Sequence, residues 1–195
     1  MTDTLPRKSS QSLALVALFA ALMAVLGLIP KIDLPGGVPI TAQSLGVMLA
    51  GCLLGPKRGF QALVLFLAAV AVGLPLLAGG RGGLGPFTVP SAGYLFGYPA
   101  AAFVTGAIMW AMPRASNALR TAVNAFVAAA LGGVVFLHAT GIAGLMLLGK
   151  MSFGEALTID LVFVPGDLIK CVLCAIVVHT VARALPNWHF GGRAH

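Results

Sequence analysis

LALVALFAALMAVLGLI (Leu13–Ile29) is an apolar segment without a charged side chain, close to the length at which a helix crosses the hydrocarbon core of a bilayer. Arg7 and Lys8 precede it, and a cleaved signal peptide is one interpretation of that pattern. The rest of the chain is equally hydrophobic, however, which favours a retained first membrane span. The segment therefore predicts a membrane protein.

The composition extends this prediction to the whole chain. Of 195 residues, 59% are hydrophobic and 9% are charged, and the mean hydropathy is +1.00. A water-soluble domain needs a charged surface, whereas a membrane domain covers itself with apolar side chains. The net charge of +7 is spread singly or in pairs between apolar segments, so the lipid bilayer is the expected partner and nucleic acid is not.

Apolar segments separated by proline, glycine and charge predict an all-α integral membrane fold with six transmembrane helices. The second segment is short for a full span, and the sixth contains Pro165 and Gly166, where we expect a kink or break. The six segments are Leu13–Ile29, Thr41–Leu54, Phe60–Leu77, Ala92–Met112, Thr121–Leu148 and Phe153–Leu185.

The basic residues predict that both termini lie in the cytoplasm. With the N-terminus inside, the cytoplasmic side carries Arg7, Lys8, Lys57, Arg58, Arg114, Arg120, Arg183 and Arg193. The outer side then carries only Lys31, Arg81 and Lys150. This distribution follows the positive-inside rule. We therefore expect a cytoplasmic tail at residues 1–12, a membrane domain at 13–185 and a second cytoplasmic tail at 186–195.

Two predicted outer connections, Lys31–Pro39 and Pro75–Pro90, are rich in glycine and proline. Glycines allow a backbone to approach a ligand closely, and loops on a rigid scaffold often carry binding residues. We expect these loops to form a ligand pocket, although flexible linkers are the alternative interpretation. In the second loop, Arg81 lies among glycines that include Gly79, Gly80 and Gly82. Its guanidinium and the backbone N–H groups of these glycines could bind a carboxylate, and the alternative is that Arg81 is an exposed loop cation.

Charged side chains inside a membrane span are costly and often functional. Asp160, Asp167 and Lys170 all fall in the sixth segment, and their spacings of seven and three residues place them on one stripe of a helix, which we expect to face the interior. Asp167 and Lys170 form either an internal ion pair or a paired acceptor and donor for a polar ligand. Asp160 either lines the entrance or caps a neighbouring helix. Gln43, at the start of the second span, makes either a ligand contact or a helix–helix hydrogen bond.

Other residue types give weaker signals. Ala17, Ala20, Ala21 and Ala24 form a small-residue stripe that permits close helix contact. His138 is interpreted as a packed or hydrogen-bonded histidine, and no role is assigned to it. The sequence contains no Walker A, G-x-S-x-G or H-E-x-x-H signature, so neither an enzyme nor a cofactor or metal site is predicted.

Three blocks in order resemble one family. VPITAQSLGVMLAGCLLGPKRG (Val38–Gly59), LAGGRGGLGPFTVPSAGYLFGYPAAAFVTG (Leu77–Gly106) and VPGDLIK (Val164–Lys170) are similar to the BioY family, the biotin-specific S components of energy-coupling-factor (ECF) transporters. That family usually reads Gly-Pro-Thr-Gly-Gly-Tyr before the fourth helix, whereas this chain has VPSAGY (Val89–Tyr94) and retains the tyrosine.

The resemblance implies a multi-pass protein of the bacterial inner membrane that binds biotin from outside. It also implies a transmembrane coupling subunit and two ATPase subunits as partners, with the alanine stripe as their docking site. We assign Asp167 and Lys170 to the polar head of biotin, Tyr94 to its ring region and residues 79–83 to its other end. The rival hypotheses are a self-standing secondary transporter for another vitamin and an intramembrane enzyme with an Asp160–Asp167 pair.

Overall fold

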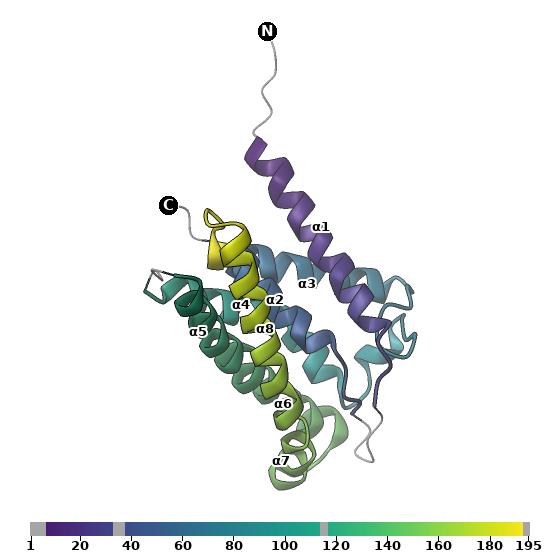
Figure 1. Ribbon diagram of the computed structural model, residues 1–195. Helices are drawn as coiled ribbons and strands as arrows, with labels where there is room; N and C mark the ends of the chain where they lie inside the picture. The colour runs from purple at the N-terminus through teal and green to yellow at the C-terminus, as the bar shows by residue number, and fades with distance from the viewer. Residues whose placement is uncertain (1–6, 33–37, 114–116, 193–195) are drawn as a thin grey trace.

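The computed structural model describes residues 7–32, 38–113 and 117–192, and the described chain is almost entirely helical (Figure 1). Two short 3₁₀ turns, η1 (Gly85–Phe87) and η3 (Phe190–Gly192), and a π-helical segment, η2 (Ala129–Phe136), supplement the α-helices. The α-helices are α1 (Arg7–Gly27), α2 (Gln43–Leu54), α3 (Pro56–Ala71), α4 (Ala92–Ala111), α5 (Ala118–Ala128), α6 (Leu137–Gly149), α7 (Phe153–Leu161) and α8 (Val164–Ala184).

Helix length and composition support the membrane assignment. In the part of the chain that the structure describes, four helical stretches are long and apolar enough to cross a bilayer: Ser10–Gly27, Ala92–Ala111, Ala118–Gly149 and Val164–Ala184. The helices α2 and α3, with 12 and 16 residues, are shorter than a full span. The all-helical class is thus confirmed and the long apolar helices fit a membrane protein, whereas the count of six spans and the orientation stay predictions.

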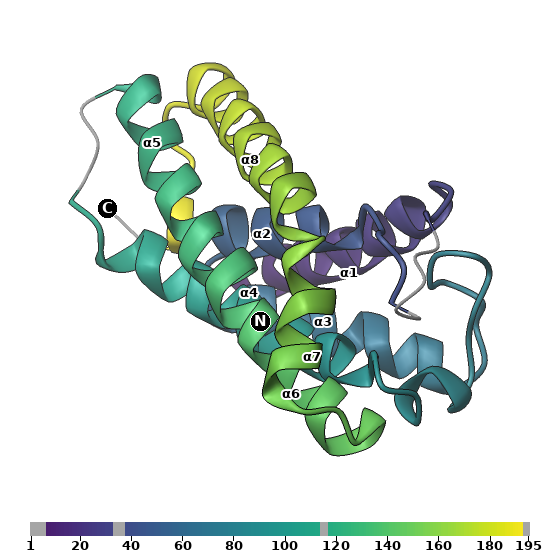
Figure 2. The ribbon, with the colours of Figure 1, turned by 90° about the horizontal axis from the view of Figure 1, so that it is seen from below.

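The helix α4 lies at the centre of the bundle and packs against α2, α3 and α6, while α8 packs against α5 and α2. Among the described helices α1 contacts only α2 and α3, and Figures 1 and 2 show it along one side of the molecule. Almost every residue of α2 is buried. Because α2 is apolar on almost all sides, other helices can enclose it without burying unsatisfied polar side chains.

The kink or break expected at Pro165 and Gly166 in the segment Phe153–Leu185 lies earlier in the chain, where two helices meet at Val162 and Phe163. A capping box of Ser152 and Glu155 starts α7. Pro165 lies in the first turn of α8, where its missing N–H leaves no helical bond unmade. The break therefore precedes Pro165. The expectation that Asp160 shares a helix with Asp167 and Lys170 was wrong, because Asp160 lies on α7 and the other two lie on α8.

The fifth predicted segment is continuous from Ala118 to Gly149 but contains the π-helical segment. In that segment Gly132 lies directly against Thr105 of α4, and Gly133 lies directly against Met48 of α2. A Cβ atom on either glycine would overlap its neighbour. The wider helical turn just precedes Leu137 and His138, which both face the interior. The π segment thus sets the rotation at which α6 presents these side chains.

The end of the bundle where α1 begins also holds the C-terminal end of α8 (Figure 1). There the indole nitrogen of Trp188 donates to the carbonyl oxygen of Leu53 at 3.0 Å. Gly191 lies against Gly55, which joins α2 to α3 with a φ of 83°. The described part of the expected C-terminal tail, residues 186–192, thus packs onto the bundle.

Candidate ligand-binding site

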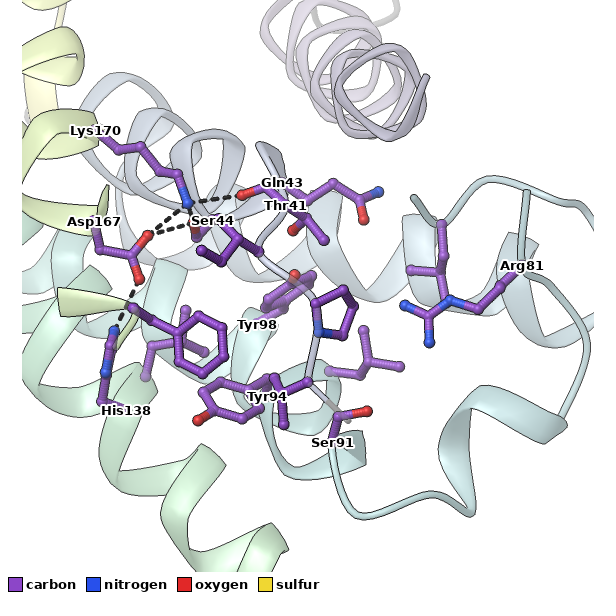
Figure 3. A pocket seen from close by; sticks show the side chains of 17 residues that line it. Thr41, Gln43, Ser44, Arg81, Ser91, Tyr94, Tyr98, His138, Asp167 and Lys170 are labelled. Carbon is purple, nitrogen blue, oxygen red and sulfur yellow. Dashed lines mark hydrogen bonds and ion pairs between the residues drawn. The ribbon is translucent and has the colours of Figure 1, made fainter. Parts of the chain in front are cut away.

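A pocket opens where the N-terminal ends of α2, α4 and α8 converge with residues 38–41 and the loop before α4 (Figure 3). The empty space of this pocket amounts to about 660 Å³ when its open mouth is included. The lining residues are Val38, Pro39, Ile40, Thr41, Gln43, Ser44, Leu77, Arg81, Ser91, Tyr94, Leu95, Tyr98, Leu137, His138, Phe163, Asp167 and Lys170.

One end of the pocket is strongly polar. The ammonium nitrogen of Lys170 lies 2.7 Å from Oδ1 of Asp167, 2.8 Å from the hydroxyl of Ser44 and 2.7 Å from the carbonyl oxygen of Thr41. Ser44 also donates to the same Asp167 oxygen at 2.9 Å. The predicted pair of Asp167 and Lys170 is therefore present, and it connects α8 to the start of α2.

The polar end extends through a residue to which the sequence assigned no role. Nε2 of His138 lies 2.9 Å from Oδ2 of Asp167, and Nδ1 lies 2.8 Å from Oδ2 of Asp160. Tyr94 donates its hydroxyl to the other Asp160 oxygen at 2.7 Å. Asp160 thus neither lines the pocket nor caps a helix. Two acids in an apolar segment need polar partners, and His138 is a polar residue in another apolar segment. That combination was the signal in the sequence from which a contact of His138 with the acids could have been predicted.

Arg81 lies at the opposite side of the pocket from Asp167 and Lys170, as Figure 3 shows. A tight turn holds it there, closed by backbone hydrogen bonds between Leu77 and Arg81. Gly79 and Gly80 have φ angles of 81° and 69°, which side chains rarely adopt. The predicted glycines therefore form the turn, and Arg81 carries its charge to the wall of the pocket.

Aromatic and aliphatic side chains separate these two polar ends. Tyr94 and Tyr98 from successive turns of α4 lie between them in Figure 3, and the ring of Tyr94 meets Phe163 edge-on with centroids 6.2 Å apart. Gly141 of α6 lies so close to the Tyr94 ring that a Cβ atom there would overlap it. The pocket therefore suits an elongated ligand with an apolar middle.

Comparison with known proteins adds the family. The model of the BioY family matches residues 1–187. The chain belongs to the BioY family. A relative from Rhodobacter capsulatus named biotin transporter BioY is 46% identical over 91% of this chain and 96% of its own length. A second, from Rhizobium etli and with the same name, is 45% identical over 91% of this chain and 96% of its own length.

The fold is also similar to a solved structure. A crystal structure of the S-component for biotin from an ECF-type ABC transporter superposes with a TM-score of 0.80. It is 32% identical in sequence, and the match covers 94% of this chain and 95% of that chain. The family predicted from the three sequence blocks is thus confirmed.

In this BioY-family chain the amide of Gln43 makes three hydrogen bonds to protein groups. Its nitrogen donates to the carbonyl oxygens of Met23 and Leu76, both at 3.1 Å, and its oxygen accepts from the N–H of Ala78 at 3.3 Å. Gln43 is 1% exposed. It therefore joins α1 and α2 to the loop that carries Arg81, whereas its predicted contact with a ligand stays a prediction.

The four alanines of the predicted docking stripe do not share one environment. Ala17 and Ala21 are exposed on the outward side of α1, while Ala20 and Ala24 are half-buried. The buried side of α1 is formed by Val16, Phe19 and Met23. Of the four alanines, Ala17 and Ala21 are therefore the more accessible to another protein.

Proposed function

We propose that the protein is the S component of an ECF transporter, which captures biotin at the outer face of the membrane. The observation that carries this proposal is the placement of Asp167 and Lys170 at one side of the pocket and Arg81 at the other, with apolar and aromatic walls between them. Biotin has the same sequence of groups, with a cyclic urea at one end, an aliphatic chain, and a carboxylate at the other end.

The hydrogen-bonding capacity of the polar end suits the urea. Oδ1 of Asp167 already accepts from Lys170 and Ser44, while Oδ2 contacts only His138 and has a second lone pair for a ligand N–H. All three donors of the Lys170 ammonium are used within the protein. We propose that Lys170 exchanges the Thr41 carbonyl for the urea oxygen when biotin binds.

The other end of the site suits a carboxylate. The Nε of Arg81 donates to the carbonyl oxygen of Ala78 at 3.3 Å, which leaves the terminal guanidinium nitrogens directed toward the pocket in Figure 3. Guanidinium groups bind carboxylates with two parallel hydrogen bonds. Arg81 therefore holds the valerate end of biotin, while Tyr94 and Tyr98 contact its ring and chain.

The arrangement of the bundle supports delivery to an ATP-driven module. The pocket lies at one end, and the start of α1 and the end of α8 lie at the other (Figure 1). With the termini in the cytoplasm, as the basic residues predict, the pocket opens outward. A coupling subunit docked on Ala17 and Ala21 then reorients the loaded protein, driven by two ATPase subunits.

The rival functions have less support. His138 lies between Asp160 and Asp167, so the two acids do not contact each other as an aspartyl pair does. A self-standing proton-coupled transporter would use the same acids, and uptake measurements separate it from the ECF mechanism. We expect uptake to stop on ATP depletion and to persist when the proton gradient is collapsed.

The bound molecule provides the direct test of function. The full-length protein is purified in detergent from cells supplied with biotin, and the small molecules released on denaturation are identified by mass spectrometry. We expect biotin in near-equal molar amount to the protein. Release of a different vitamin, or no binding of added biotin by the emptied protein, would refute the proposal.

A further inference from the structure

The four ionisable side chains around the polar end of the pocket form a continuous buried chain. Asp160 of α7 and Asp167 of α8 are 2% and 6% exposed, and His138 of α6, which joins them, is 5% exposed. Lys170 extends the chain on the pocket side, and Tyr94 of α4 donates to its far end. The network therefore connects α4, α6, α7 and α8 on both sides of the helix break at residues 162–163.

The hydrogen bonds require one proton more than the ordinary ionisation states supply. Both ring nitrogens of His138 face carboxylate oxygens, at 2.8 Å and 2.9 Å. An ionised carboxylate only accepts hydrogen bonds, and a neutral imidazole has one N–H and one bare nitrogen. If the ring were neutral and both acids were ionised, the bare ring nitrogen would face a carboxylate oxygen with no hydrogen between them, so that two lone pairs would repel each other.

A proton on the ring resolves this conflict and balances the charge. Two carboxylates, the Lys170 ammonium and a His138 imidazolium sum to zero, whereas a neutral ring would leave a net negative charge buried in the protein. Imidazole is a stronger base than carboxylate, so the extra proton belongs on the ring. Each remaining carboxylate oxygen then accepts from Tyr94, Ser44 or Lys170.

We infer that His138 is a positioning residue whose doubly protonated ring connects Asp160 to Asp167 and so holds the ligand-binding carboxylate in place. Asp167 lies in the first turn of α8, directly after the helix break, where its direction depends on how that turn is held. Asp160 anchors the ring from α7 without lining the pocket. This inference rests on the proposed function for the role of Asp167, but the protonation of the ring can be measured without ligand.

The first test is nitrogen NMR of ligand-free protein labelled at histidine, with the His138 signals assigned by their absence from His138→Gln. We expect both ring nitrogens of His138 to be protonated in the wild type at neutral pH. In Asp160→Asn the amide replaces a negative acceptor with a donor, so the ring is expected to become neutral with one bare nitrogen. A bare ring nitrogen in the wild type would overturn the inference.

The second test compares biotin affinity in two variants of the same residue. Asp160→Asn keeps a polar partner for the ring and leaves the network neutral, so we expect its dissociation constant to stay within about threefold of wild type. Asp160→Leu removes the anchor, and we expect affinity to fall roughly tenfold or more. Equal loss in both variants would overturn a positioning role, because the Asp160 charge itself would then matter.

Two controls keep the outcomes distinct. His179→Gln changes a half-buried histidine near the other end of α8 and is expected to alter neither the His138 signals nor affinity. If the wild type binds no biotin, the proposed function fails, while the NMR measurement still decides the protonation of His138. If Asp160→Leu does not fold, the Asp160→Asn protein alone decides the inference, through its ring signals and its affinity.

Discussion

The ammonium nitrogen of Lys170 lies 2.7 Å from Oδ1 of Asp167, three residues earlier on α8, and both side chains are largely buried. Removing one partner of such a pair leaves an uncompensated charge, which costs several kcal/mol in buried sites. When Lys170 is replaced, Ser44 and His138 remain as partners of Asp167, and when Asp167 is replaced, Thr41 and Ser44 remain as partners of Lys170, so the fold is expected to survive either substitution.

Asp167→Asn and Lys170→Ala are each expected to weaken biotin binding by about 3 kcal/mol, or roughly 100-fold, because each removes a charge-assisted hydrogen bond to the urea. Isothermal titration in detergent measures the change. Lys57→Ala, which alters an exposed lysine at the start of α3, serves as the control. Wild-type affinity in both pocket variants would contradict the assignment of the polar end.

Arg81→Ala is expected to weaken the binding of biotin by roughly 10-fold to 100-fold, because the carboxylate loses its guanidinium partner. The same substitution should change the binding of biotin methyl ester by less than about threefold, since the ester lacks that charge. A competition assay with both ligands against both proteins gives the coupling between the arginine and the carboxylate. Equal loss for acid and ester would place the carboxylate elsewhere.

Ala17→Trp is expected to leave biotin affinity unchanged and to reduce ATP-dependent uptake at least about tenfold, because a bulky side chain on the outward face of α1 blocks close helix packing. Copurification of the coupling subunit measures assembly directly. Leu18→Trp, at an exposed position about 100° around the helix, is the control and should permit uptake. Full transport by the Ala17 variant would exclude this docking surface.

Gly141→Ala is expected to weaken biotin binding roughly tenfold, because a Cβ atom overlaps the ring of Tyr94 and forces it toward the ligand or away from Asp160. The matched control is Gly154→Ala, since a Cβ atom on Gly154 meets no atom within 4 Å. Titration calorimetry and thermal unfolding separate lost affinity from lost stability. An unchanged dissociation constant in Gly141→Ala would show that the Tyr94 ring does not contact the ligand.

The sequence predicted the helical class and several helix positions well. Apolar segments bounded by proline, glycine and charge placed α4 within one residue at its end, because composition alone marks a span of that length. The pair of Asp167 and Lys170 was also predictable, since two charges three residues apart on an apolar helix lie within reach of each other.

The rest of the site depends on contacts between distant segments. His138 is the only ionisable residue of the apolar helix α6 (Leu137–Gly149), and only the packing of α6 against α7 and of the π segment against α8 brings it between two acids. The helix–helix hydrogen bond offered as one alternative for Gln43 is present, but the sequence did not indicate its partners, Met23 of α1 and Leu76 of a loop. The break at residues 162–163 was displaced from the expected site because proline is well tolerated in the first turn of a helix.

The hydrogen bond from Trp188 to Leu53 has a practical consequence for following the protein at work. The chain contains two tryptophans, and this one contacts the C-terminal end of α2, whose N-terminal end carries Ser44 beside the pocket. A rigid helix of 12 residues spans about 18 Å, so a small tilt of α2 at the pocket moves the indole environment at the far end. The intrinsic fluorescence of Trp188 is thus a label-free optical sensor of that tilt.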